Sequence, residues 1–283
     1  MQIALFIAGN LLALGVSAQT AELLVREREP WRRLVVTLAG FPITILLTVR
    51  ILGVAGALTG PWAVGLLAAV FAGLTVARGG RIAGVLPGLS EEGERGLWGG
   101  AERGPLWPLP LGALAASWLY IATSTCLKGV RFCMDDLSYH AAAPAQWLLD
   151  HSLSLAPFNY HAYFPFNAEC LSLWFMLPMH SDVFANLTGL YWATLAAVVL
   201  VGLGLALGRS QSEAALPAAI ALALPIIVHQ ATGTFSAVDL AGPAAALAAL
   251  ALLVPSPGDD ARAGRARDAL LAGLMMGVGV GAK

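Results

Sequence analysis

Two adjacent carboxylates, Asp135 and Asp136, are the residues of this sequence best suited to acid–base chemistry. Two like charges this close raise the pKa of one carboxyl group and leave the other ionised, which suits a general base. The pair also fits a structural role, in which one aspartate caps the following helix and the other is solvated. Both interpretations stay open at this point.

Further charged residues lie before the pair and inside apolar stretches. Lys128 and Arg131 could meet the charge of a leaving phosphate, or they could reach towards lipid headgroups and anchor the chain. Asp239 and Lys283 fall within apolar stretches, where a charge is costly, so they predict either a polar site or a structural ion pair. Arg50, near the end of another stretch, can snorkel to the interface.

The histidines do not follow a metal-binding pattern. His140, His151 and His161 stand eleven and ten residues apart, which fits no short ligand spacing. A divalent metal site assembled in three dimensions stays open, and no organic cofactor is predicted. The three cysteines include no Cys-x-x-Cys pair.

Composition identifies the class of protein. Apolar residues make up 58% of the 283 residues and charged residues 12%, against about 45–50% and about 25% in soluble domains. So few charges cannot cover a soluble globule. The net charge of −1 leaves no basic surplus for a phosphate backbone, which excludes nucleic acid as a partner. These proportions predict a membrane protein with several spans.

The spans are expected to be helices, because the apolar stretches are continuous rather than alternating. A helix needs about 20 apolar residues to cross the hydrocarbon core. Eight windows approach this length, and the chain ends inside the last: 3–25, 34–56, 61–77, 109–126, 184–208, 214–231, 238–254 and 269 onward. We therefore predict an all-α, polytopic helical bundle of about eight spans.

Basic residues predict the orientation of this bundle. Twelve of the 16 fall in four connections on one side, at 26–33, 78–108, around 209 and at 255–268. By the positive-inside rule this side is cytoplasmic, so the N-terminus and residues 127–183 are expected outside. The excess of Arg over Lys, 14 to 2, indicates the plasma (inner) membrane of a bacterium.

The outer loop at 127–183 is expected to be folded and functional, because it is long and has no low complexity. Residues 137–150 fit a short helix at the membrane surface, kinked or interrupted at Pro144. Residues 170–180 are apolar but too short to cross, which fits an interfacial or re-entrant piece.

Several short motifs follow one another in an order that resembles a known family. In chain order they are Asp135-Asp136-Leu-Ser-Tyr139-His140, Ala145-Gln-Trp147-Leu, Tyr163-Phe-Pro165-Phe-Asn167-Ala-Glu169 with Leu173-Trp174, Ala237-Val-Asp239-Leu, and Gly277-Val-Gly-Val-Gly-Ala-Lys283. They resemble the polyprenyl-phosphate-sugar-dependent glycosyltransferases of the GT-C fold, in the protein-mannosyltransferase-like and aminoarabinose-transferase-like branch. The resemblance covers residues 109–283, so residues 1–108, three spans and a cytoplasmic connector, are an addition ahead of it.

The resemblance implies an inverting transfer of a sugar from a polyprenyl-phosphate donor to an acceptor hydroxyl at the outer face of the membrane. Asp135 matches the general base, and Asp136 would orient the acceptor beside it. The other polar residues assigned to substrate binding in the motifs are Tyr139, His140, Tyr163, Asn167, Glu169, Asp239 and Lys283. The acceptor would be a lipid, a glycan or a protein, and membrane lipids would surround the enzyme.

The sequence departs from the family in two ways. Relatives often carry Lys-Pro-Pro where this chain has Phe-Pro-Phe at 164–166, so the phosphate ligand stays open among Lys128, Arg131 and Lys283. Relatives also continue for several more spans, so this chain is expected to be an N-terminal fragment.

Two other functions fit the same sequence. A transporter or lipid flippase would line its path with Arg50, Asp239 and Lys283. A non-catalytic membrane subunit would dock a partner on the outer loop and would tolerate substitution of Asp135 and Asp136.

Overall fold

The computed structural model describes residues 1–25, 30–82, 108–128, 136–154, 166–233, 237–254 and 263–282, with the backbone alone at 128, 136, 233 and 263–265. Every regular element in these ranges is a helix. The elements are α1 (Gln2–Val25), α2 (Pro30–Val54), α3 (Gly60–Ala77), α5 (Pro108–Lys128), η1 (Asp136–His140), α6 (Ala142–Asp150), α7 (Asn167–Met176), η3 (Asp182–Phe184), α8 (Leu187–Ala206), α9 (Gln211–Ala223), α10 (Pro225–Gly233), α11 (Val238–Leu253) and α12 (Ala263–Val280).

The described helices confirm an all-α protein suited to a membrane. Five segments are long and apolar enough to cross: α1, α2, α3, α5 and the η3–α8 segment. The count among the described residues rises to six if the bent pair α9–α10 is one span. This is fewer than the eight windows of the sequence.

The difference lies in the last three windows. The window 214–231 is divided into α9 and α10, which are bent by 68°. Leu224 is extended between them, with φ −64° and ψ 128°, because the following Pro225 disfavours the helical conformation of the residue before it. The helix α11 has only 16 residues, and α12 begins at Ala263 with charged residues in its first turns.

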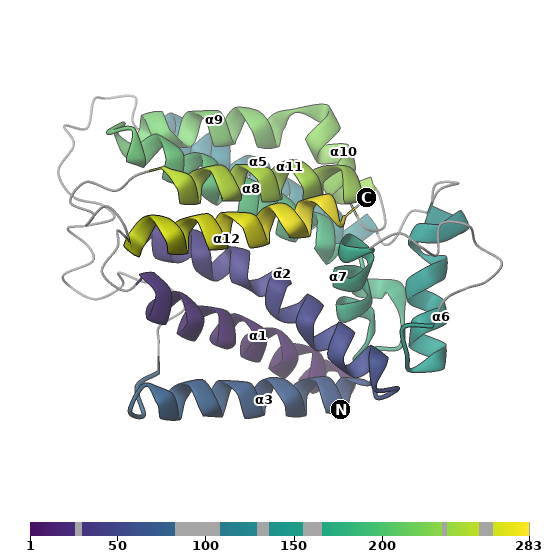
Figure 1. Ribbon diagram of the computed structural model, residues 1–283. Coiled ribbons are helices and arrows are strands. Elements are labelled where there is room, and N and C mark those ends of the chain that lie inside the picture. Colours follow the sequence, from purple (N-terminus) through teal and green to yellow (C-terminus); the bar gives the residue numbers. More distant parts are fainter. Residues whose placement is uncertain are drawn as a thin grey trace.

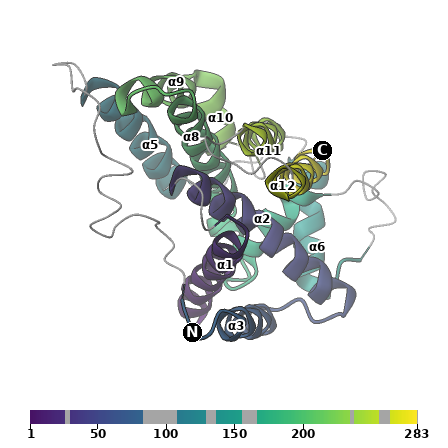
Figure 2. The ribbon, with the colours of Figure 1, turned by 60° about the vertical axis from the view of Figure 1, so that its left-hand side comes forward.

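The helix α2 lies at the centre of the molecule. It packs against α1 and α3 on one side and against α7, α8, α11 and α12 on the other. Figure 2 shows this order, with α5 and α9 farthest from α3. In Figure 1 the start of α1, the end of α12 and the helices α6 and α7 all lie at the right-hand end of the molecule, which we call the α6–α7 end. The opposite end, where α1 ends and α2 begins, is the arginine end.

A buried arginine joins α2 to the last two helices at the arginine end. Arg32, which the sequence placed in a polar connection, lies inside α2 with 0% of its side chain exposed. Its guanidinium donates to the carbonyl groups of Ala251 (3.4 Å) and Leu252 (3.3 Å), and it forms an ion pair with Asp268 at 3.5 Å. The region of α1, α2 and α3, which we call the three-helix region, is therefore joined to α11 and α12 at this end.

Two short helices follow η1 in the chain, and both differ in detail from expectation. The expected helix over 137–150 is interrupted at Ala141, between η1 and α6, rather than at Pro144. Pro144 lies in the first turn of α6, where a missing N–H has no intrahelical acceptor to lose. The piece at 170–180, expected to be interfacial or re-entrant, falls largely in α7, where every residue from Ala168 to Met176 is buried by the protein.

Candidate functional site

The structure describes only part of the predicted site. Asp135, Arg131, Tyr163 and Lys283 lie outside the described residues. Asp136 is the first residue of η1 and Lys128 the last of α5, and both are described by backbone alone. The side chains that can be examined are those of Tyr139, His140, Asn167, Glu169 and Asp239.

His140 and Glu169 form a buried pair between η1 and α7. The imidazole Nδ1 and the carboxylate Oε1 are in hydrogen-bond contact, although the residues are 29 apart in sequence. The side chains are 8% and 1% exposed, so this pair is almost completely removed from solvent. A buried carboxylate needs such a partner, because an isolated charge in an apolar interior is strongly unfavourable. The neighbouring Tyr139 ring lies 4.0 Å from the His140 ring, measured between centroids.

Asn167 ties the start of α7 to the end of α12. Its backbone N–H donates to the carbonyl of Gly281 at 2.8 Å, and its side-chain Nδ2 donates to the carbonyls of Gly277 (3.3 Å) and Val278 (3.2 Å). A Cβ atom on Gly281 would lie 2.3 Å from this Nδ2. Glycine at 281 is therefore what allows the closing Gly-rich motif to approach Asn167.

Arg50 takes part in this region, although the sequence did not predict that it contacts the motif residues. Its guanidinium donates to Asn167 Oδ1 at 2.9 Å, across 117 residues of sequence. Arg50 is exposed, yet its charge reaches α7, where it lowers the pKa of Cys170 against a larger effect of burial. The signal in the sequence was a lone arginine in an apolar stretch, which snorkelling explained equally well.

The predicted site residue Asp239 belongs to the same end of the molecule. It lies in the first turn of α11 and accepts a hydrogen bond from Gln230 of α10 at 3.2 Å. Helices α11 and α12 run antiparallel and close together, since a Cβ on Gly279 would lie 3.0 Å from Ala245 Cβ. Asp239 is thus near the end of α12, but its carboxylate has a different partner from the His140–Glu169 pair.

These contacts give the α6–α7 end a defined set of polar groups. They comprise a buried acid paired with an imidazole, an amide held on the end of α12, and an exposed guanidinium bonded to that amide. Such a set of groups can orient a polar substrate by hydrogen bonds and can stabilise a negative charge on it. Among the residues that the structure describes, no three His, Cys, Asp or Glu side chains are grouped closely enough to hold a metal ion.

Comparison with protein-family models, with curated proteins and with solved structures finds no match for this chain.

Proposed function

We propose that this protein is an integral-membrane glycosyltransferase, which moves a sugar from a polyprenyl-phosphate donor to an acceptor hydroxyl. The reaction would take place at the α6–α7 end, which the distribution of basic residues predicts to be outside the cell. The proposal begins from the order of the sequence motifs, which resembles that of the GT-C glycosyltransferases.

One observation carries the proposal beyond that resemblance. Three of the matched motifs lie far apart in sequence, and residues from all three meet at one end of the molecule. His140 of the first motif contacts Glu169 of the aromatic motif, and Asn167 of the same aromatic motif binds the closing Gly-rich motif through Gly277 and Gly281. Separate motifs that converge in space support a common site.

In this proposal Asp135 is the general base, and Asp136 orients the acceptor. Asp135 would take the proton of the acceptor hydroxyl while the oxygen forms a bond to the anomeric carbon of the sugar. The bond from that carbon to the phosphate oxygen would break, and the polyprenyl phosphate would leave with the electron pair. Attack opposite the leaving group inverts the anomeric centre. Glu169 would hold the His140 imidazole in place beside the acidic pair.

The transfer reaction tests this assignment directly. Full-length protein in membranes would receive synthetic polyprenyl-phosphate mannose or arabinose, radiolabelled in the sugar. We expect Asp135→Asn to lower transfer by about 10²–10⁴-fold, the usual contribution of a general base, with unchanged insertion and elution. Asp182→Asn, an acid of the same outer segment at the start of η3, is the matched control and should keep full transfer. Transfer retained by the Asp135→Asn protein would overturn the assigned base.

A transporter or lipid flippase is the second candidate, and one observation favours it. Transporters often place broken helices at their substrate sites, and α9–α10 is bent by 68°. Pro225 accounts for this bend, however, and Leu224 at the break is 45% exposed rather than lining a closed path. Flux of a labelled lipid through vesicles, with no sugar transfer, would favour this candidate.

A further inference from the structure

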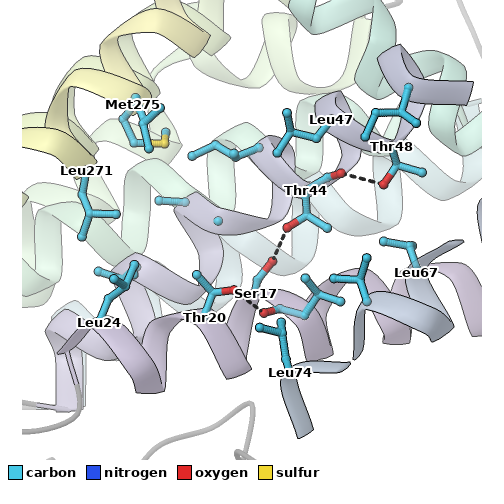
Figure 3. A pocket seen from close by; sticks show the side chains of 18 of the residues that line it. Ser17, Thr20, Leu24, Thr44, Leu47, Thr48, Leu67, Leu74, Leu271 and Met275 are labelled. Atoms are coloured by element: carbon cyan, nitrogen blue, oxygen red, sulfur yellow. Dashed lines mark hydrogen bonds between the residues drawn. The ribbon is translucent and has the colours of Figure 1, made fainter. Parts of the chain in front are cut away.

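An apolar crevice lies between α1, α2, α3 and α12 and has a volume of about 390 Å³. None of the side chains that line it is titratable. Its hydroxyl groups bond within the protein: Thr48 donates to the carbonyl of Thr44 at 2.8 Å, and the hydroxyls of Ser17 and Thr44 contact each other at 3.2 Å, as Figure 3 shows. The crevice therefore supplies an apolar surface and neither an acid nor a base.

A carboxylate and an imidazole that could exchange protons are paired at the α6–α7 end of the molecule. Glu169 Oε1 meets Nδ1 of His140, and the two side chains are 1% and 8% exposed. A carboxylate oxygen can only accept a hydrogen bond, so an ionised Glu169 requires the proton on Nδ1. In the neutral imidazole the second nitrogen, Nε2, then carries a lone pair. This pairing prepares Nε2 to accept a proton.

The nitrogen Nε2 of His140 is not engaged elsewhere in the described part of the chain. No described residue forms a hydrogen bond or an ion pair with it. The neighbouring Tyr139 ring lies 4.0 Å from the imidazole, measured between centroids, and contacts it as an aromatic group. The imidazole is thus fixed at one nitrogen, while the other has no partner among the residues that the structure describes.

The carboxylate of Glu169 is held by a helix that has little freedom to move. Every residue of α7 from Ala168 to Met176 is buried, and the helix packs against α2, α6 and α8. At the start of α7, Asn167 bonds to Arg50 of α2 and to the carbonyl of Gly281 at the end of α12. A group that takes part in proton transfer has to be held in a fixed orientation. Glu169 can therefore orient the imidazole from a rigid position.

The backbone brings this imidazole close in the chain to the acidic pair. The element η1 is a single turn of π-helix from Asp136 to His140. A π-helix bonds residues that are five apart, so the first and last residues of η1 lie about one turn from each other. Such turns are rare and are frequent at functional sites. The proposed base, Asp135, directly precedes this turn in the sequence.

We propose that His140 accepts, at Nε2, the proton that Asp135 takes from the acceptor hydroxyl, and that Glu169 positions the ring for this step. The inference rests on the proposed function. The O–H bond of the Asp135 carboxyl group breaks, an N–H bond forms at Nε2, and Asp135 is ionised again. The imidazolium then releases its proton to water before the next turnover. Imidazole is the side chain that most readily takes up and releases a proton at neutral pH, which suits this task.

Nitrogen NMR tests the pairing without any sugar substrate. Full-length protein is prepared with isotope-labelled histidine, and His140 is identified as the signal that is absent from the His140→Gln protein. We expect the neutral ring to carry its proton on Nδ1 and none on Nε2. Glu169→Gln should disturb this pattern, because a side-chain amide can also donate a hydrogen bond to Nδ1. A proton on Nε2 in the neutral ring of the unsubstituted protein would overturn the proposal.

Sugar transfer by the same proteins measures the role of the pair. His140→Gln keeps a hydrogen-bond donor for Glu169 but cannot take up a proton, so it should lower kcat by about 10²-fold and leave KM unchanged. Glu169→Gln should lower kcat by a similar factor, because it no longer fixes the proton on Nδ1. The matched control on α7 is Ser172→Ala, which removes a buried hydroxyl bonded to Thr188 at 3.0 Å and should keep full transfer.

Added imidazole separates the loss of a base from the loss of the fold. His140→Ala leaves space where the ring lies, and imidazole in solution should raise transfer by this protein about tenfold. It should not raise transfer by the Asp135→Asn protein, which lacks the preceding group in the proton path. A loss in the His140→Ala protein that imidazole leaves unchanged would show a structural role and overturn the proposal.

The outcomes also separate this inference from the proposed function. Transfer that depends on Asp135 but keeps its full kcat in the His140→Gln and Glu169→Gln proteins would overturn the role of His140 alone. An equal loss in the Ser172→Ala protein would show that the losses come from disturbed packing of α7, and it would also overturn that role. No transfer by the unsubstituted protein would overturn the proposed function, and the proton path with it.

Discussion

Neighbouring side chains of α7 have different roles because the helix is buried on all sides. Glu169 and Cys170 are each 1% exposed, whereas the preceding Asn167 is partly exposed at the start of the helix. The acid finds a partner in His140, while the thiol is enclosed among apolar groups. Burial raises the pKa of Cys170 to about 12, and the nearby Arg50 only partly offsets this effect. Cys170 is therefore expected to be structural and unreactive.

Thiol labelling measures this burial. In a Cys126→Ser/Cys133→Ser background, we expect maleimide to modify Cys170 of the folded protein on the order of a thousandfold more slowly than Cys170 of the unfolded protein at pH 8. The reason is that the thiolate is the reactive species, and a pKa near 12 makes it rare. The rate should increase with pH, because the thiolate fraction grows as the pH approaches that pKa.

The measurement is a mass-spectrometric time course at several pH values, with the triple serine variant as a blank. Labelling of the folded protein at the rate of a free thiol would contradict the burial of Cys170.

Helix α8 packs closely against its neighbours through its glycines. A Cβ on Gly189 would lie 2.3 Å from the carbonyl oxygen of Ala231 in α10, and a Cβ on Gly204 would lie 2.7 Å from Ala214 in α9. Helices in a membrane gain stability from such close backbone approach, since lipid supplies no hydrophobic drive between them. The bent pair α9–α10 is thus held against α8 at both of its parts.

Adding one methyl group at this contact tests its importance. Gly189→Ala is expected to destabilise the protein by about 1–3 kcal/mol or more, because the contacted atoms belong to the backbone and cannot rotate away. Gly65→Ala in α3 is the matched control, since a Cβ there meets nothing within 4 Å. The control should be neutral or slightly stabilising, as alanine favours a helix over glycine. Unfolding in a denaturing detergent measures both, and equal stabilities would contradict this packing.

Across the whole molecule, Arg32 joins the three-helix region of α1, α2 and α3 to the last two helices, α11 and α12. It pairs with Asp268 of α12 and binds the last carbonyl groups of α11, so one side chain connects three helices at the arginine end. The Arg50–Asn167 bond connects α2 to α7 at the other end. Helix α2 is therefore attached at one end to α11 and α12 and at the other end to α7.

A double-mutant cycle measures the Arg32–Asp268 pair. Arg32→Met is expected to destabilise the protein by up to about 3–5 kcal/mol, because it removes the buried guanidinium that pairs with Asp268 at 3.5 Å and leaves the longer contact with Arg267 at 3.8 Å. Asp268→Leu should have a similar effect, and the double variant should lose less than the sum of the two. Stabilities come from unfolding in denaturing detergent, with Arg209→Met at an exposed position as the control. Strict additivity would show that the two charges do not interact.

Several features of the fold were accessible from the sequence. Long continuous apolar stretches predicted α1, α2, α3, α5 and α8 within a few residues, because helix formation and lipid exposure depend on local composition. A short helix at 137–150 was also predicted, with its break placed three residues too late. Pro225 was visible in the sequence, but the mean hydropathy of the apolar stretch does not show the bend that this proline causes between α9 and α10.

The contacts within the candidate site were much less predictable from the sequence, because they depend on tertiary structure. The sequence singled out His140, Asn167 and Glu169 separately, but it did not predict that Glu169 pairs with His140 or that Asn167 bonds to Arg50. It also placed Arg32 in a polar connection, although Arg32 is buried, and it did not predict that α7, within the expected interfacial or re-entrant piece, is buried by other helices. By itself, the sequence determined the helices and their apolar character, since these follow from residues within one or two turns. Only the packing of helices decided which charges are buried and which distant residues meet, because that depends on contacts between segments from 29 to 220 residues apart.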